Sequence, residues 1–305
     1  MGNGTVVSIG TFDGVHKGHQ AILTEVGRQA KARQLKSVAY AFEIPPRWTA
    51  EREPFRFLLL PRPLKTRFLK EYVDRVLSVS LSQVRDLSPE TFANHILGNE
   101  LNAAVVVVGT GFRFGRHREG DVERLREIGQ RLGISVVSVL PVEEEGIPVS
   151  STWIRRALRG GYIDQATRLL GRPPILLGEV SPGDHVGRTL GYPTANLVVE
   201  EQILLPAVGI YLTHVFYLGR QSEGLLYVGS RPTLGGGELR CEIHLLTNPD
   251  QDLYGELMEI QLLERLREDR TFPSLTGLRR QIERDIAEAK KRLPRYAACA
   301  RSFSG

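Results

Sequence analysis

The sequence predicts two domains: an α/β domain built on a parallel sheet, followed by an all-β barrel or sandwich with a helix at its end. Three observations support this prediction. Short apolar segments alternate with helical ones through the first half, which is typical of a parallel sheet covered by helices. Between residues 175 and 263, short β-rich segments broken by Gly, Pro and Asn follow one another, which indicates a barrel or a sandwich. A chain of 305 residues also suits two domains of roughly 150 residues each.

The first half is expected to contain five strands and four helices. The segment Ala103–Val108 is apolar at every position, as expected of an inner strand that is buried on both faces. The helices are predicted from apolar residues that recur every three or four positions. The expected strands are Thr5–Gly10, Ser37–Phe42, Arg75–Val79, Ala103–Val108 and Ile134–Leu140, and the expected helices are His19–Arg33, Arg62–Tyr72, Pro89–Leu97 and Asp121–Leu132.

Two short helical segments between Ser151 and Leu170 precede the change to a β-rich pattern. The domain boundary is therefore expected near Gly171–Pro174, which gives domains of residues 1–172 and 173–305. A last helix follows Ser274, which is a suitable N-cap, and it carries one apolar stripe. The expected strands are Ile210–Tyr217, Leu225–Gly229, Leu239–Leu246 and Leu257–Leu263, and the stripe comprises Leu275, Leu278, Ile282, Ile286 and Ala289.

Composition narrows the class of protein. Apolar residues make up 41% and charged residues 25% of the chain, which is ordinary for a soluble globular protein and excludes a disordered or fibrous one. The longest apolar run is far shorter than the roughly 18–20 residues of a membrane span, and the first ten residues lack the features of a signal peptide. A cytoplasmic protein without membrane association is therefore expected. Cys241 and Cys299 fit neither a disulfide framework nor a zinc pattern.

The charge of the chain suits small anionic ligands. The net charge of +5 comes from 40 basic and 35 acidic residues, and seven of the basic residues are lysine, so the remaining 33 are arginine. Arginine offers planar, forked donors that fit phosphates and carboxylates. Because these residues are spread along the chain rather than gathered in a stripe, a nucleic-acid partner is not expected.

The first motif is Gly10–His19, GTFDGVHKGH, which joins the first expected strand to the first expected helix. In open α/β sheets ligands bind at the carboxyl ends of the strands, and anions bind at helix N-termini. Two imidazoles three residues apart, at His16 and His19, can both face that position and donate hydrogen bonds to a triphosphate. The glycines let the backbone approach a nucleotide. The alternative is that both histidines are loop and cap residues without a chemical role.

This string resembles the HxGH signature of the nucleotidylyl transferase superfamily, and in full it is similar to bacterial FAD synthetases. The segment Val149–Arg155 (VSSTWIR) resembles the superfamily's late ISSTxxR motif, whose hydroxyls can cap a helix that points at phosphates. The resemblance implies a Rossmann-like nucleotidylyltransferase domain, with His16, His19 and Arg155 as catalytic residues and Arg155 neutralising the leaving pyrophosphate. The implied ATP-binding residues are Gly10, Phe12, Asp13, Gly14, His16, His19, Ser150, Ser151, Thr152 and Arg155.

A near match to the GxGxxG dinucleotide fingerprint lies between these motifs, at Gly109–Gly115. Its third glycine is one position late, no helix is expected to start there, and no acidic residue follows at the required distance. A nicotinamide-dinucleotide site is therefore rejected.

The second domain contains Gly187–Asn196, GRTLGYPTAN, a glycine-rich loop that leads into a β-like segment. Threonine and asparagine oxygens suit Mg²⁺ carried by a nucleotide, although composition alone equally allows a plain hairpin. The string closely resembles the GRTLGxPTAN motif of riboflavin kinases, and PAVGIY, GSRPT, CEIHLL and LYG follow in that family's order. The resemblance implies that Thr194 and Asn196 hold Mg²⁺. The implied ATP-binding residues are Gly187, Arg188, Gly191, Pro193, Thr194 and Asn196.

The same resemblance implies that Glu242 is the catalytic base for a ribityl hydroxyl. Alternation along a strand places Cys241, Ile243 and Leu245 on one face, with Glu242 and His244 on the other. Glu242 can then face the mouth of the barrel while its neighbours fill the core. Alternation does not decide which face is the mouth, and a solvated surface glutamate is the alternative.

The α/β domain departs from the family pattern at two positions. Pro45 stands where the family usually has a histidine, and Gly111 stands where it usually has Asp or Asn. A positioned transition-state donor is typically worth about 10²–10³ in rate. The departures therefore motivate an alternative, a riboflavin kinase whose first domain is catalytically weak or regulatory. The retained histidines, hydroxyls and arginine favour a working enzyme.

The resemblance as a whole implies a bifunctional enzyme. It is expected to phosphorylate riboflavin to FMN with ATP, and to adenylylate FMN to FAD with a second ATP, releasing pyrophosphate. Mg²⁺ is expected in both steps. An RNA-binding protein is a further alternative, because HxGH domains also occur in aminoacyl-tRNA synthetases, but the half that resembles riboflavin kinase argues against it.

Overall fold

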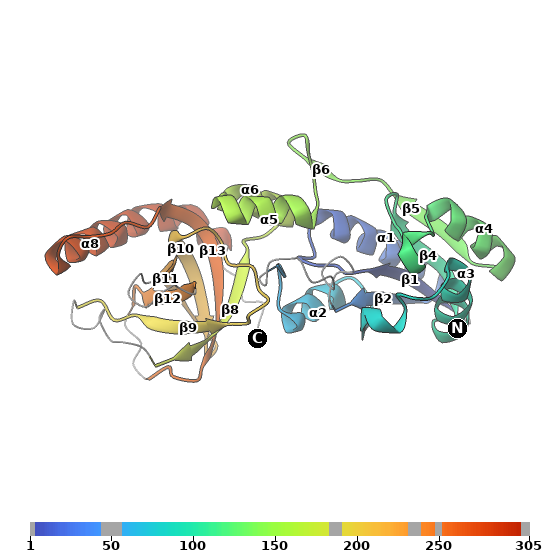
Figure 1. Cartoon of the computed structure of the whole chain (residues 1–305), viewed down its shortest axis with the longest axis horizontal. Coiled ribbons are helices and arrows are strands. Elements are labelled where there is room, and N and C mark those ends of the chain that lie inside the picture. The colour runs from blue at the N-terminus through green and yellow to red at the C-terminus, as the bar shows by residue number, and fades with distance from the viewer. Residues whose placement is uncertain (1–3, 44–56, 183–190, 231–238, 248–251, 300–305) are drawn as a thin grey trace. The chain divides into compact units, whose positions relative to one another are not determined.

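The computed structural model describes residues 4–43, 57–182, 191–230, 239–247 and 252–299 (Figure 1). The chain packs into two compact units. One comprises Met1–Pro54 with Arg62–Ser151, and the other comprises Phe55–Pro61 with Thr152–Gly305. Packing thus groups residues 152–172 with the second unit, and the boundary between residues 172 and 173 stays a prediction about domain organisation.

A parallel sheet of five strands forms the centre of the first unit, in the order β3-β2-β1-β4-β5. The central strand pairs Val7 with Val38 on one side and with Val106 on the other. This arrangement confirms the α/β fold that the alternating pattern predicts. The strands are β1 (Thr5–Gly10), β2 (Lys36–Phe42), β3 (Arg75–Val79), β4 (Ala103–Gly109) and β5 (Ser135–Val139).

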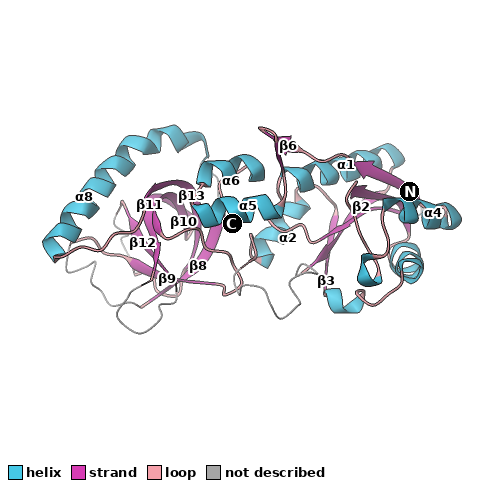
Figure 2. Ribbon diagram, turned by 45° about the horizontal axis from the view of Figure 1, so that its top comes forward, coloured by secondary structure: helices cyan, strands magenta, loops and turns pink. Residues whose placement is uncertain are grey.

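Helices pack against both faces of this sheet (Figure 2). On one face Val7 and Val106 share a core with Leu97 and Leu125. Val105, which alternation places on the other face, is just as buried, and helix α1 contacts β1, β2 and β4. The helices are α1 (Lys17–Arg33), α2 (Arg62–Lys70), α3 (Pro89–Phe92), which continues as π-helical turns over Ala93–Glu100, and α4 (Val122–Leu132).

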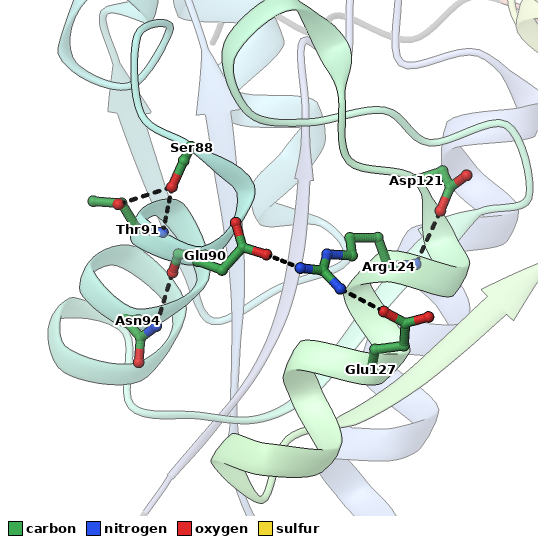
Figure 3. Close-up of polar contacts among 7 residues, drawn as sticks. All are labelled: Ser88, Glu90, Thr91, Asn94, Asp121, Arg124 and Glu127. Atoms are coloured by element: carbon green, nitrogen blue, oxygen red, sulfur yellow. Dashed lines mark hydrogen bonds and ion pairs between the residues drawn. The ribbon is translucent and has the colours of Figure 1, made fainter.

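A side-chain cap begins each of the helices α3 and α4, and an ion pair joins the two helices (Figure 3). The Ser88 hydroxyl accepts from the backbone N–H of Thr91 at 3.1 Å, and the Asp121 carboxylate accepts from that of Arg124 at 2.9 Å. Each helix therefore starts at a side chain that satisfies a free backbone donor. Arg124 also pairs with Glu90 on α3 and with Glu127 on its own helix. Because these pairs are largely exposed, they orient the two helices but add little to stability.

A closed antiparallel barrel of six strands forms most of the second unit, in the order β10-β11-β12-β9-β8-β13, with β13 pairing back to β10. Its interior is filled by side chains such as Tyr211, Leu226 and Ile260, which are fully buried. The predicted barrel is confirmed, although the sequence analysis did not name β8. The strands are β8 (Ile175–Ser181), β9 (Ala195–Val199), β10 (Gly209–Tyr217), β11 (Arg220–Gly229), β12 (Arg240–Leu245) and β13 (Leu257–Arg267).

Helix α8 (Leu275–Arg292) covers part of the outer face of the barrel, where its Ala289 shares a small core with Leu212 and Leu225. Ser274 caps the helix, as predicted, by accepting from the N–H of Gly277 at 3.1 Å. Leu275 was expected on the buried stripe but is 63% exposed, because the first turn lies beyond the face that the helix covers (Figure 1). The remaining elements are β6 (Glu143–Glu144), β7 (Ile147–Pro148), α5 (Ser151–Gly160), α6 (Ile163–Leu170) and a 3₁₀ segment, Leu293–Cys299.

No helix within the described ranges combines the length and the apolar character that a membrane crossing requires.

Candidate active sites

The two histidines of the first motif lie together at the carboxyl end of β1, as their spacing predicts. His16 is the N-cap of α1, and its Nδ1 accepts a hydrogen bond from the backbone N–H of His19 at 3.3 Å. This cap explains why α1 begins two residues before its expected start. The imidazole rings stack with their centroids 3.7 Å apart and their planes 18° apart. His16 therefore does serve as a cap, while its ring also forms one surface with that of His19.

A tight turn between β1 and α1 presents these rings. Phe12 and Val15 have φ angles of +47° and +40°, which side chains other than glycine adopt at a cost, and Gly14 has φ of +83°. The Phe12 ring packs edge-on against His19, with centroids 5.4 Å apart, and fills the space above Gly10. Strain of this kind concentrates at functional sites, where the surrounding structure holds it in place.

The late motif meets this turn directly. The Ser151 hydroxyl donates to the backbone oxygen of Asp13 at 2.9 Å, which ties the start of α5 to the first motif. Gly18 lies against the same segment: a Cβ there would stand 3.2 Å from the His16 ring and 3.3 Å from the Val149 oxygen. The glycine of HxGH thus suits a close approach of α1 to residue 149, where a side chain would force its neighbours to shift.

The other residues of the late motif are placed as follows. Ser150 precedes α5, and Thr152 lies in its first turn, half-buried. Arg155 lies one turn after Ser151 and is almost fully buried, with its Nε donating to the backbone oxygen of Phe57 at 2.8 Å. Its contribution to pyrophosphate release stays a prediction.

Electrostatics favour a neutral His19. Burial, followed by the positive charges of His16 and Lys65, holds the pKa of His19 well below its ordinary value of 6.5. Its Nδ1 is buried and has no hydrogen-bond partner among the described residues. A neutral ring carries one proton. Because Nδ1 has no acceptor nearby in the described part of the chain, the proton can form a hydrogen bond only from Nε2.

Lys65 is a charged neighbour that the sequence analysis missed. It is 5% exposed, and its ammonium group donates to the backbone oxygens of Phe42, Glu43 and Thr11 at 2.8, 3.3 and 3.4 Å. These oxygens lie at the carboxyl ends of β2 and β1, so Lys65 links the ends of both strands, close enough to His19 to affect its pKa. Burial lowers its pKa from the ordinary value. No local signal in the sequence indicates this placement, because lysine is rarely buried and the oxygens that accept from it belong to other elements.

The second unit contains a cavity of about 470 Å³ between the outer face of the barrel and α8. Its lining is partly apolar and partly polar. The apolar lining residues include Ile210, Leu225, Phe272, Leu278 and Ile282, and the polar ones include Tyr192, Thr194, Glu242, His244, Arg267, Asp269 and Asp285. A cavity with this mixed lining suits a ligand that combines a flat ring with a polar chain.

Strand β12 has the alternation that the sequence predicts. Cys241, Ile243 and Leu245 are buried in the barrel, and Glu242 and His244 project to the opposite face, where both line the cavity. That face is the outer surface of the barrel under α8, a location that alternation alone does not give.

Glu242 and the loop before β9 are close together. The Thr194 hydroxyl donates to the Glu242 carboxylate at 3.4 Å, and Asn196 lies directly opposite Glu242 in the β9–β12 pairing. Residues opposite each other in an antiparallel pair share a face of the sheet. Thr194, Asn196 and Glu242 therefore offer hydroxyl, amide and carboxylate oxygens in one place, a donor set that suits Mg²⁺ arriving with a nucleotide. No cluster of three or more His, Cys, Asp or Glu side chains arranged for a metal occurs in the described part of the chain.

Some predicted positions cannot be placed. Gly187, Arg188 and Pro45 lie outside the described residues, whereas Gly191 and Pro193 lie in the described part of the loop before β9. Gly111 is exposed after β4, and a Cβ there would meet nothing within 4 Å. The missing polar side chain therefore leaves open space rather than a rearranged contact.

Comparison with known proteins agrees with both expected domains. Residues 1–153 match the family described as FAD synthetase, and residues 170–293 match the family described as riboflavin kinase. A bifunctional riboflavin kinase/FMN adenylyltransferase from Pseudomonas fluorescens is 39% identical over 94% of this chain and 92% of its own. The chain belongs to the bifunctional riboflavin kinase/FMN adenylyltransferase family.

Further similarity covers nearly the whole chain. The enzyme of the same name from Escherichia coli K12 is 36% identical over 94% of this chain and 92% of its own. A crystal structure from Streptococcus pneumoniae, described as a macrolide-efflux protein, is 32% identical with a TM-score of 0.85 and covers 95% of both chains. The chain thus combines riboflavin kinase and FMN adenylyltransferase activities, and the alternative of a kinase with a regulatory first domain is not favoured.

Proposed function

We propose that the kinase half transfers the γ-phosphate of ATP to riboflavin in the cavity beside β12. The observation that carries this assignment is the Glu242 carboxylate, which lines the cavity and accepts from the Thr194 hydroxyl at 3.4 Å. Apolar lining residues such as Phe272 and Ile282 would cover the flat flavin ring. The ribityl chain would then reach toward Glu242.

In this reaction Glu242 accepts the proton of the terminal ribityl hydroxyl as that oxygen attacks the γ-phosphorus, and ADP leaves. A positioned general base contributes about 10²–10⁴ in rate. Thr194 and Asn196 would hold Mg²⁺, which when bound would neutralise negative charge on the phosphates of ATP. Gly187, Arg188, Gly191 and Pro193 are the remaining proposed contacts to ATP. Positioning of the nucleotide by this loop is expected to matter as much as the base.

We propose that the adenylyltransferase half joins AMP from ATP to FMN at the turn between β1 and α1. A phosphate oxygen of FMN attacks the α-phosphorus, and pyrophosphate leaves. His19, neutral and with its Nδ1 buried, would donate through Nε2 to the triphosphate, with the stacked His16 beside it. Arg155 would neutralise the leaving pyrophosphate. Gly10, Phe12, Asp13, Gly14, Ser150, Ser151 and Thr152 are the remaining proposed contacts to this ATP.

The substrates of both steps are soluble small molecules, so we place the protein in the cytoplasm and assign it no nucleic-acid partner. Mg²⁺ is the proposed metal of both steps.

Chromatography of the products tests both halves at once. Riboflavin or FMN is supplied with MgATP and inorganic pyrophosphatase, and FMN and FAD are quantified. Glu242→Gln is expected to abolish FMN formation from riboflavin while FAD formation from FMN continues. His19→Ala is expected to have the opposite effect. Exposed residues of the same types, in Glu200→Gln and His95→Ala, are matched controls that should retain both activities.

The proposal predicts this crossed pattern and no other. Wild-type protein that converts riboflavin to FMN but never FMN to FAD would contradict the adenylyltransferase assignment. Full kinase activity in Glu242→Gln would contradict the assigned base.

A further inference from the structure

His244 occupies a place in the kinase cavity to which no role has been given so far. It lies two residues after Glu242 on β12, so both side chains project to the same face. Its Nδ1 lies 2.9 Å from the backbone oxygen of Pro193, and the edge of the Tyr192 ring packs against it with ring centroids 5.8 Å apart. His244 thus contacts two successive residues of the loop that leads to Thr194.

The chemistry of this contact sets the state of the ring. A carbonyl oxygen can only accept a hydrogen bond, so Nδ1 of His244 must carry the proton. In the neutral ring, Nε2 then carries the lone pair. The ring therefore acts toward Pro193 as a donor, a function that does not require it to exchange protons during a reaction.

The sheet itself does not hold this loop. The β9–β12 pairing runs from Cys241 opposite Leu197 to Ile243 opposite Ala195, and it stops there. Thr194 stands one residue beyond the last pair, where the ladder would have placed it opposite His244. At this point the backbone pairing has ended, and a hydrogen bond from the His244 side chain to the Pro193 oxygen connects the loop to β12 instead.

We propose that His244 is a positioning residue of the kinase half: its Nδ1–H holds the Pro193 carbonyl and thereby keeps the Thr194 hydroxyl beside the Glu242 carboxylate. This inference rests on the proposed roles of Thr194 and Glu242. Tyr192 completes the arrangement, since its hydroxyl donates to Glu283 on α8 at 3.2 Å. The loop is then held from β12 on one side and from α8 on the other.

Three substitutions of one residue test this role. His244→Asn places an amide N–H near the position of Nδ1, whereas the amide of His244→Gln reaches the position of Nε2, and His244→Leu has no donor. His244→Asn is expected to keep kcat/KM for ATP within about threefold of wild type. His244→Gln and His244→Leu are expected to lose about 10- to 100-fold, because displacement of a reacting group by about 1 Å has a cost of that order.

Three further readouts separate positioning from other roles. FAD formation from FMN, which occurs in the other half, should be unchanged in all three variants, and the hydrogen-exchange protection of β10 and β13 should stay at its wild-type level and so report that the barrel is folded. His244→Asn has no titrating side chain and should keep the pH profile of the wild-type kinase reaction, since the ring is not a base in this proposal.

Each other outcome overturns the proposal. Equal losses in all three variants would mean that Nε2 or the ring itself is needed. Wild-type rates in all three would mean that the hydrogen bond to Pro193 does not contribute to the kinase reaction. Loss of the kinase activity together with the hydrogen-exchange protection of β10 and β13 in all three would assign His244 to the fold of the barrel. If Glu242→Gln leaves the kinase rate intact, the proposed function fails instead. If Glu242→Gln loses the kinase activity while His244→Leu retains it, only the proposed positioning role of His244 is wrong.

Discussion

Removing the Asp285 carboxylate is predicted to loosen α8 from the barrel. Asp285 on α8 is 8% exposed and Arg267 at the end of β13 is 13% exposed, measured over their side chains. Arg267 Nε lies 3.0 Å from both Asp285 oxygens, and its terminal nitrogen lies 2.8 Å from one of them. Gln281 adds a donor to the same carboxylate at 2.8 Å. The pair is thus buried, forked and further hydrogen-bonded.

The size of the effect follows from this burial. At an effective dielectric constant of about 20, unit charges about 4 Å apart attract by about 4 kcal/mol. Asp285→Ala removes that attraction and leaves the Arg267 guanidinium buried without its carboxylate. Breaking one side of a buried pair typically costs about 3–5 kcal/mol. This is a large part of the roughly 5–15 kcal/mol by which a folded domain is stable.

Hydrogen exchange measured by mass spectrometry gives the local free energy of opening. In Asp285→Ala, peptides from α8 and from the adjacent strands β10 and β13 are expected to lose about 3–5 kcal/mol of protection. Peptides from β1 and β4, in the other unit, are the internal control and should not change. The double variant Arg267→Met/Asp285→Leu, which removes both charges and keeps apolar volume, should recover most of the loss.

A change below about 0.5 kcal/mol in Asp285→Ala would refute the reasoning, because it would mean that water already screens the pair. A double variant as unstable as the single one would show that packing, rather than the unpaired charge, is the source of the effect.

Three further predictions concern the adenylyltransferase half, and the two that measure activity use FMN formation from riboflavin as the control. Ser151→Ala removes the hydrogen bond to the Asp13 backbone oxygen and should lower kcat/KM for FAD formation about tenfold. An unchanged value would show that the turn between β1 and α1 keeps its conformation without this hydrogen bond. Gly18→Ala drives a Cβ against the His16 ring and the Val149 oxygen, at 3.2 and 3.3 Å, and should lower FAD formation at least tenfold in steady-state assays. Because the pKa of His19 is lowered in the folded chain, the unfolded chain binds a proton at this residue at a higher pH than the folded chain does as pH falls below 6.5. The stability that this residue contributes is therefore complete above pH 6.5 and declines below it, by at most about 1.4 kcal/mol per pH unit. His19→Gln should show a shallower decline in urea unfolding between pH 7 and 5.5, and equal slopes would contradict the shift.

Several parts of the molecule follow directly from local sequence. The three-residue spacing of His16 and His19 predicts that both rings lie at one helix start, and the structure stacks them. The alternation in β12 correctly separates the buried Cys241 from Glu242, because a strand turns successive side chains to opposite faces whatever surrounds it. The cap at Ser274 is equally local.

Other features could not be predicted from the sequence, because they depend on contacts between elements that are distant in the chain. Leu275 fits the apolar stripe of α8 yet is exposed, since a stripe is buried only as far as a surface exists to cover it. Lys65 stands in a buried position that propensity disfavours, and the backbone oxygens that accept from it belong to other elements. Nothing in the strand pattern indicates that Glu242 faces a cavity under α8 rather than open solvent.

The sequence by itself determined the two halves, their element types and the residue chemistry of both sites, because periodicity and short spacings depend on neighbours in the chain. The tertiary structure alone decided which of these residues meet. Ser151 bonds to the backbone of Asp13 across 138 positions, and His244 bonds to that of Pro193 across 51. Contacts over such separations exist only once the sheet and the barrel have closed, since packing of the whole chain sets them and no local preference does.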